Sequence, residues 1–132
     1  MSIDVTKLQP QVAQSMESHY YSKGGVRINP VWWQVLHQDR TYTSIRFDNV
    51  TQVSDDDAYD VLSIHTTWQG IDNREVKNGA PLIFETRVES KKHFWVWNSP
   101  DSAMAEVIHV QLLKQLQDGI PPEEIDIYNP LN

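Results

Sequence analysis

Hydrophobic and polar residues alternate along two stretches of the chain, and this spacing predicts half-buried β-strands. In residues 61–68, one face is formed by Leu62, Ile64, Thr66 and Trp68, and the other by Val61, Ser63, His65 and Thr67. In residues 82–89, Leu82, Phe84, Thr86 and Val88 alternate with Ile83, Glu85, Arg87 and Glu89. A third strand is expected from Thr41 onward, with one face formed by Thr43, Ile45 and Phe47.

The polar link at residues 90–92 is short enough for a hairpin turn. A further strand is therefore expected to return through residues 93–97. Taken together, these segments predict an antiparallel meander of three to four strands.

The clearest helix signal follows the hairpin. Ser99 is expected to cap the helix, Pro100 to occupy its first turn and Gly119 to end it. An apolar row at four-residue spacing consists of Met104, Ile108, Leu112 and Leu116. The far side is expected to carry Ser102, Glu106, His109 and Gln117. The apolar row would pack the helix against one face of the sheet.

The earlier segments carry weaker signals. Asn29 and Pro30 can start a helix, in which Val31, Trp32, Val35 and Leu36 fall at helical spacing. A strand over residues 31–37 is the alternative, because so short a segment does not let periodicity decide, and we favour the helix. A second, N-terminal helix is possible after Pro10, where apolar residues recur every four positions. Its apolar stripe is thin, so this helix would depend on docking.

The order of elements predicts a single α+β domain with two peripheral ends. We expect an N-terminal arm at residues 1–24, a core domain at residues 25–119 and an extended tail at residues 120–132. The 132-residue length is that of one ordinary domain.

The charge balance argues against some partners. Eighteen Asp and Glu residues against eleven Lys and Arg residues give a formal net charge of -7. A phosphate backbone would be repelled on average, so nucleic-acid binding is not expected. The chain has no apolar run near the roughly 18 residues that suggest a membrane span, and no signal-peptide pattern. We therefore expect neither export nor a membrane partner.

Metal and cofactor sites are not expected either. The chain has no cysteine, and no two of its five histidines stand three or four residues apart. The acidic residues 55–57 lack the ligand spacing of a calcium loop. His65 with Asp72 is the best acid–base pair, since a carboxylate can orient an imidazole. The simpler interpretation is that His65 is a hydrogen-bonded strand residue, so we assign no catalytic residue.

A surface for a protein partner is the more promising site. Glu85 and Arg87 are expected to meet aromatic residues across the hairpin. Such a set can form a binding patch, because Trp and Arg dominate interface energetics. The candidate partner-binding residues are Glu85, Arg87, His93, Trp95 and Trp97, together with Asp72 and Asn73 in the preceding loop. Cross-strand charge pairing and Arg–Trp stacking would explain the hairpin set without any ligand.

Three motifs in order connect the chain to a known group. Residues 66–72 fit T-x-[FW]-x-G-[LI]-D, residues 81–86 fit P-L-[IL]-F-E-T, and residues 105–109 fit A-x-x-x-H. This succession resembles a group of small phage and prophage proteins of unassigned function. Asn73 stands where the group usually has a histidine, and Arg87 where it has an apolar residue. The resemblance implies origin in a phage genome and no particular activity.

Three functional hypotheses stay open on the sequence. The first is a phage-encoded accessory protein in the host cytoplasm that binds another protein, such as a host or defence factor. The second is a small structural component of the virion, in the neck, tail or baseplate. The third is an enzyme that uses His65 and Asp72. The sequence does not indicate the oligomeric state.

Overall fold

The computed structural model describes residues 19–53, 59–72, 74 and 79–127. The first half contains β1 (Tyr20–Tyr21), β2 (Arg27–Ile28), α2 (Pro30–His37), α3 (Arg40–Thr43) and β3 (Ser44–Val53). The second half contains β4 (Tyr59–Trp68), β5 (Phe84–Glu89), β6 (Phe94–Ser99), α4 (Ser102–Gln117) and the short 3-10 helix η1 (Pro122–Glu124). Residues 10–18 of the possible helix after Pro10, the acidic residues 55–57 and Asn73 lie outside the described residues. Tyr20, which continued the four-residue spacing of that helix, belongs to β1.

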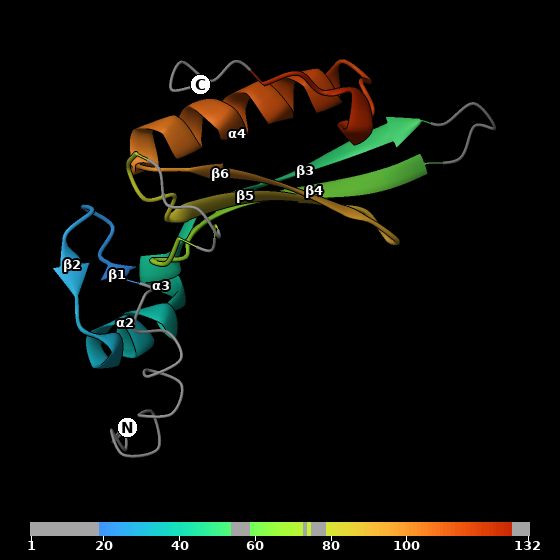
Figure 1. The fold of residues 1–132 in the computed structure, drawn as a ribbon. Coiled ribbons are helices and arrows are strands. Elements are labelled where there is room, and N and C mark those ends of the chain that lie inside the picture. The colour runs from blue at the N-terminus through green and yellow to red at the C-terminus, as the bar shows by residue number, and fades with distance from the viewer. Residues whose placement is uncertain (1–18, 54–58, 73, 75–78, 128–132) are drawn as a thin grey trace.

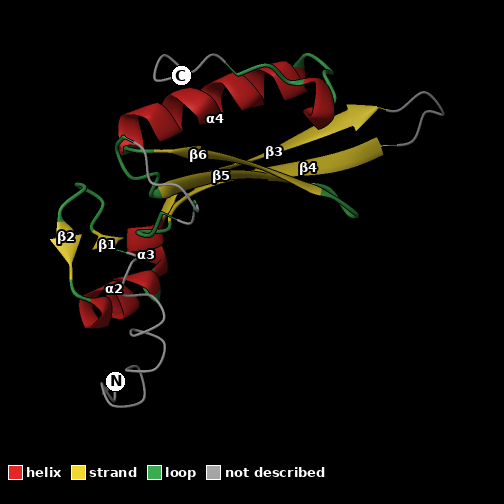
Figure 2. Cartoon of the chain, viewed as in Figure 1, coloured by secondary structure: helices red, strands yellow, loops and turns green. Residues whose placement is uncertain are grey.

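The main sheet is an antiparallel meander in the order β3-β4-β5-β6. Figure 1 shows α4 lying along one face of this sheet, while β1, β2, α2 and α3 gather at one end of it. Figure 2 shows the same separation of helix and sheet into two layers. The predicted single α+β domain, with a meander and a C-terminal helix packed on one sheet face, is confirmed.

A hydrophobic core fills the space between the sheet and α4. The sheet contributes Val50, Leu62, Ile64 and Val88. The helix contributes Ile108, Leu112 and Leu116. Thr66, Trp68, Phe84 and Thr86 are buried as well, as the alternation predicts. Strict alternation in a strand puts every second side chain on one face, which is why these positions were readable from the sequence. The pattern fails at residues 82 and 83, because β5 begins only at Phe84: Ile83 is completely buried and Leu82 is partly exposed.

A second cluster joins the N-terminal elements to the end of the sheet. Its buried members are Trp68, Ile83, Phe84 and Ala105, against which Trp33 and Leu36 of α2 pack. The helix predicted at α2 is confirmed, with the Asn29 side chain accepting a hydrogen bond from Trp32 N at 2.8 Å. β1 joins the same region, because Tyr21 N donates to Gly70 O at 2.9 Å.

β3 begins later than the strand expected from Thr41 onward, and its alternation is interrupted. Residues 41–43 belong to α3, which Asp39 caps, and β3 begins at Ser44. The pairing register shifts between Ser44 and Arg46. Beyond this irregularity the even-numbered residues face α4, so Val50 is buried and Phe47 is 54% exposed. A bulge of this kind exchanges the two faces of a strand and cannot be seen in the alternation itself.

The start of α4 also differs from expectation. Its N-cap is Asp101, whose carboxylate accepts a hydrogen bond from Met104 N at 2.7 Å. Ser99 belongs to β6 and pairs with Phe84, so its buried side chain is held in the sheet. Gly119 follows the helix with a φ of 85°, and the N–H of Ile120 donates to Gln115 O at 3.0 Å. This backbone pattern terminates the helix as predicted.

The described part of the tail lies on the body of the protein. η1 interrupts the extended chain, and Ile125 and Ile127 pack against the main core. The Gln115 side chain donates to Asp126 O at 3.0 Å. None of the described helices is long and apolar enough to cross a membrane.

Candidate functional site

The sheet face turned away from α4 is the main exposed feature of the protein, and we refer to it as the open face. Its centre is one row of cross-strand neighbours, one from each strand: Phe47, His65, Arg87 and Val96. No described helix lies over this part of the sheet (Figure 1). Side chains on this face are therefore open to solvent, whereas their neighbours on the opposite face pack into the core under α4.

Arg87 organises the charges of the open face. Its guanidinium donates to Glu85 Oε1 and to Glu89 Oε1, each at 3.2 Å. The Cζ atom of Arg87 also lies 4.4 Å from the ring centre of Phe94, which is 60% exposed. Since these groups remain partly open to water, the ion pairs orient the arginine more than they stabilise the fold.

His65 occupies the centre of the row. Its Nε2 lies 3.0 Å from Ser44 Oγ, and its ring contacts Phe47 edge-on with 5.4 Å between ring centres. Burial lowers the pKa of His65 below its usual value, and the charge of Glu89 opposes this shift only in part. Because the usual histidine pKa of about 6.5 is already below 7, His65 with its lowered pKa is neutral at pH 7. A hollow of about 410 Å³ is lined by Phe47, His65 and Arg87 of the row and by Glu85 and Glu89.

The two tryptophans predicted for this surface lie on the opposite face. Trp95 pairs with Val88 and Trp97 with Thr86, both of which are buried under α4. Trp95 and Trp97 are half-buried and pack against the main core. The expected meeting of Glu85 and Arg87 with these tryptophans was wrong, because cross-strand partners share a face. Arg87 has Val96 as its cross-strand partner and Phe94 as its aromatic contact.

His93 lies between the hairpin turn and β6. Its side chain is exposed, and its ring centre lies 6.2 Å from that of Trp95. Its backbone N–H donates to Ser90 Oγ at 3.1 Å, which tightens the turn. His93 thus sits at the rim of the sheet, apart from the central row.

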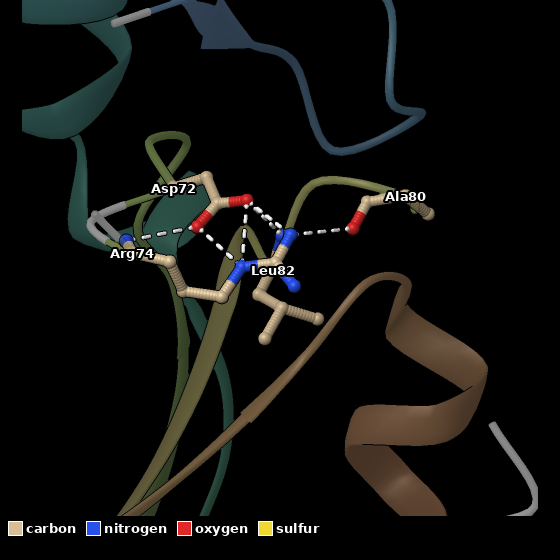
Figure 3. Close-up of polar contacts among 4 residues, drawn as sticks. All are labelled: Asp72, Arg74, Ala80 and Leu82. Atoms are coloured by element: carbon tan, nitrogen blue, oxygen red, sulfur yellow. Dashed lines mark hydrogen bonds and ion pairs between the residues drawn. The ribbon is translucent and has the colours of Figure 1, made fainter. Parts of the chain in front are cut away.

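Asp72 joins the described residues that precede β5 (Figure 3). Its carboxylate, 5% exposed, lies 2.6 Å from Arg74 Nη2 and accepts a hydrogen bond from Leu82 N at 3.2 Å. The Arg74 side chain reaches on to Ala80 O at 3.1 Å. Burial raises the pKa of Asp72, but the hydrogen bonds from Arg74 and Leu82 outweigh this effect and leave the pKa below its usual value.

The Asp72 loop borders the open face. A second hollow, of about 250 Å³, is lined by Asp72 and Arg74 together with Glu85, Val96 and Asn98. Glu85 lines both hollows, so the loop and the central row form one continuous surface. The predicted acid–base pair is divided between them: His65 contacts Ser44 in the row, whereas the Asp72 carboxylate contacts Arg74 and Leu82 in the loop.

A chain of polar side chains crosses the core between β3 and β5. His109 Nε2 lies 2.7 Å from Asp48 Oδ2, and His109 Nδ1 lies 2.7 Å from Thr66 Oγ1. Thr66 Oγ1 lies 2.8 Å from Thr86 Oγ1. His109 was expected on the far side of α4, and this was wrong, because its side chain is completely buried. The carboxylate–imidazole–hydroxyl order has the form of a nucleophile-activating group.

The burial of this polar chain gives it a structural role. Neither hydroxyl has any exposed surface, so no substrate atom can approach Thr66 or Thr86 while α4 is in place. The carboxylate of Asp48 accepts only, so the Nε2–H of a neutral His109 donates to it and Nδ1 accepts from Thr66. Each polar group thereby has a partner, as buried polar groups require. The chain fixes α4 to the sheet at a defined register.

Sequence reasoning missed Phe47, Phe94 and Val96 as members of the exposed surface. The short hairpin contained the signal for two of them. A turn flanked by Ser90 and His93 places Val88 opposite Trp95. Residues 94 and 96 of β6 then lie on the same face as Glu89 and Arg87. Phe47 gave no such signal, since the irregularity near Ser44 set its side. Within the described residues, no three His, Asp or Glu side chains come together to hold a metal ion.

The fold and this surface define a small α+β domain with one covered and one open sheet face. No protein-family model matches the chain, and no curated protein and no solved structure matches it significantly.

Proposed function

We propose that the protein is a binding module that attaches to another protein through the open face. The observation that carries this proposal is the exposure of large apolar side chains around a charged centre. Phe47 is 54% exposed, Val61 56% and Phe94 60%, although each belongs to the main sheet. Exposed apolar groups around a partly desolvated arginine are typical of protein-binding surfaces.

The charges of the open face indicate the chemistry of the partner. Glu85 and Glu89 outnumber Arg87, and His65 adds no charge at pH 7. The whole chain carries a net charge of -7. A complementary partner therefore presents a Lys or Arg side chain to the hollow, with apolar residues on either side of it.

The resemblance of three motifs to phage and prophage proteins gives this proposal its setting. We propose a phage-encoded accessory protein that acts in the host cytoplasm on a host or defence factor. A role in the virion is the competing proposal, and mass spectrometry of purified particles distinguishes the two. Presence of the protein in intact particles at a fixed copy number would replace the accessory role with a structural one.

Affinity capture from host lysate tests the open face directly. The tagged protein is compared with the double variant Phe94→Ser/Arg87→Ala, which removes an exposed ring and the central cation. The matched control is Val107→Ser/Glu106→Ala, which alters two exposed residues on the outer side of α4. We expect a partner that the wild type and the control retain and the open-face variant loses. Equal retention by all three proteins would refute binding through this face.

A further inference from the structure

We propose that two copies of the chain join through β6, so that their sheets form one continuous eight-stranded sheet. The two edges of the sheet, β3 and β6, differ in how they are protected. β3 carries the Arg46–Asp48 ion pair and the register shift next to it, both of which discourage strand addition. β6 has the sequence FWVWNS, with no charge, no proline and no bulge in its pairing with β5.

The backbone of β6 has its free groups at alternate residues. Ser90 N donates to His93 O at 2.9 Å, so these two residues form a hydrogen-bonded pair at the turn. Hydrogen-bonded and non-bonded pairs alternate along an antiparallel ladder. Trp95 and Trp97 therefore bond to β5, whereas residues 94, 96 and 98 direct their N–H and C=O groups to the edge. Among the described residues, no backbone hydrogen bond from another segment reaches these groups.

This arrangement selects one register for a two-fold pair. With Val96 on the symmetry axis, Val96 faces Val96 of the partner subunit, and Phe94 faces the partner subunit's Asn98. All of these residues have their backbone groups at the edge, so the two strands exchange hydrogen bonds along their length. Trp95 then lies opposite Trp97 of the partner subunit on the α4 side of the sheet. Cross-strand aromatic pairs and a charge-free seam both favour such pairing.

The charges beyond the two ends of β6 favour the antiparallel direction. Lys91 and Lys92 precede β6, and Asp101 follows it, and all three side chains are exposed. Residue 91 falls opposite residue 101 of the other copy when residue 96 is on the axis. Each positive end therefore lies beside a negative end, although the two chains as a whole repel each other at a net charge of -7 each. This local complementarity favours a second copy over an unrelated strand.

The dimer does not depend on the partner proposed for the open face. It would place two open faces side by side on one sheet surface, because residues 94, 96 and 98 belong to that surface as well. A partner with repeated binding sites would then gain avidity.

Sedimentation velocity over a range of protein concentrations tests the dimer. The wild type is expected to sediment as a dimer. Val96→Lys places two like charges at the axis and is expected to give a monomer with an unchanged circular dichroism spectrum. The control, Val107→Lys, adds the same charge to the exposed side of α4 and is expected to remain a dimer. A monomeric wild type at every concentration, or a dimeric Val96→Lys variant, would overturn the proposal.

A disulfide test examines the register independently of affinity. The chain has no cysteine, so Val96→Cys introduces a single thiol at the proposed axis. Directly opposite Cα atoms in a hydrogen-bonded pair lie about 5.5 Å apart, a separation that a disulfide can span. Under mild oxidation, Val96→Cys is expected to form a covalent dimer, while Val107→Cys stays monomeric on a non-reducing gel. Equal cross-linking of the two variants would contradict this register.

Discussion

The imidazole of His109 on α4 and the carboxylate of Asp48 on β3 form a hydrogen bond of 2.7 Å beside the apolar core between helix and sheet. The bond joins residues 61 positions apart, and through Thr66 it extends to the middle of the sheet. α4 is thus positioned both by apolar packing and by a directional polar contact. A directional contact fixes rotation of the helix, which apolar packing alone specifies less tightly.

Replacing this histidine should reduce stability. His109→Gln retains one polar contact at most and leaves a buried group without its partner, at a cost of about 1–3 kcal/mol in the free energy of unfolding. Urea unfolding at pH 7.5, followed by circular dichroism, measures the change. His93→Gln is the control, because His93 is exposed. An unchanged unfolding midpoint for His109→Gln would show that the buried bond contributes nothing.

The same histidine should make stability depend on pH. Burial lowers the pKa of His109, and the hydrogen bond to Asp48 opposes this effect only in part. Its pKa is therefore lower in the folded than in the unfolded protein, where it is about 6.5. The contribution to stability is complete above pH 6.5 and is lost as the pH falls through the folded-state pKa.

Unfolding free energies measured from pH 7.5 to pH 5 test this dependence. The wild type should become less stable toward pH 5, and His109→Gln should show a smaller decline. His65 contributes in the same direction, because burial lowers its pKa too. The double variant His65→Gln/His109→Gln should therefore show the flattest profile. Parallel profiles for the wild type and the double variant would exclude these two groups as the source.

Gly70 should tolerate no side chain. Its φ of 72° lies in the left-handed region, and an added Cβ would overlap the ring of Trp68 and lie 2.8 Å from Trp33 Cδ1. Gly70→Ala is expected to cost about 1–2 kcal/mol for the backbone and a further 1–3 kcal/mol for overpacking. Gly25→Ala is the matched control, with a φ of 80° and no atom within 4 Å of the added Cβ.

Thermal unfolding of both glycine variants separates the two effects. Gly25→Ala should lose only the backbone part, so its midpoint should lie between those of the wild type and Gly70→Ala. Equal losses for the two variants would mean that the aromatic rings around Gly70 move aside without cost.

Asp72→Asn should loosen the loop before β5. The neutral side chain loses its ion pair with Arg74 and cannot accept the full set of hydrogen bonds that now includes Leu82 N. Hydrogen bonds to charged groups contribute about 1.5–3 kcal/mol, so a loss of this order is expected at pH 7. Asp126→Asn removes the same charge from an exposed position and serves as the control.

The loss from Asp72→Asn should disappear in acid. The pKa of Asp72 is lowered in the folded protein, so its contribution is complete above the unfolded value of about 3.9. It is lost as the pH falls through the folded-state pKa. Chemical unfolding from pH 7 to pH 2.5 should therefore show the variant and the wild type converging. A constant difference over this range would assign the loss to packing.

Truncation of Trp97 should cost much more stability than truncation of Phe94. Trp97 packs against the main core, and Trp97→Ala is expected to cost about 3–5 kcal/mol in the free energy of unfolding. Phe94 is 60% exposed, and Phe94→Ala should change stability by about 0.5 kcal/mol or less. Urea unfolding compares the two directly. A loss for Phe94→Ala as large as that for Trp97→Ala would show that the open face supports the fold.

The alternating pattern separated the two faces of β4, and of β5 from Phe84 onward, and the Asn29–Pro30 start favoured the helix at α2 over a strand. These signals are local, since they depend on the period of a strand or on the first turn of a helix. The sides taken by Trp95 and Trp97 depend on the pairing of two strands, for which the turn at residues 90–93 is decisive. The candidate surface was therefore only half predictable: Glu85 and Arg87 lie on it, while their expected tryptophan neighbours do not.

The sequence by itself determined the strands of the meander, the helices α2 and α4, their order and most of the apolar positions that drive them together, because burial and periodicity act over a few residues. Only the tertiary structure decided where His109 and Phe47 point. His109 lies at the edge of the apolar row of α4, about 60° around the helix from Leu112 and about 20° from Leu116, and Asp48 and Thr66 on neighbouring strands give it partners inside. Phe47 lies outside because the register shift at Ser44 reverses the faces of β3. Both outcomes depend on contacts between distant segments, which no local pattern contains.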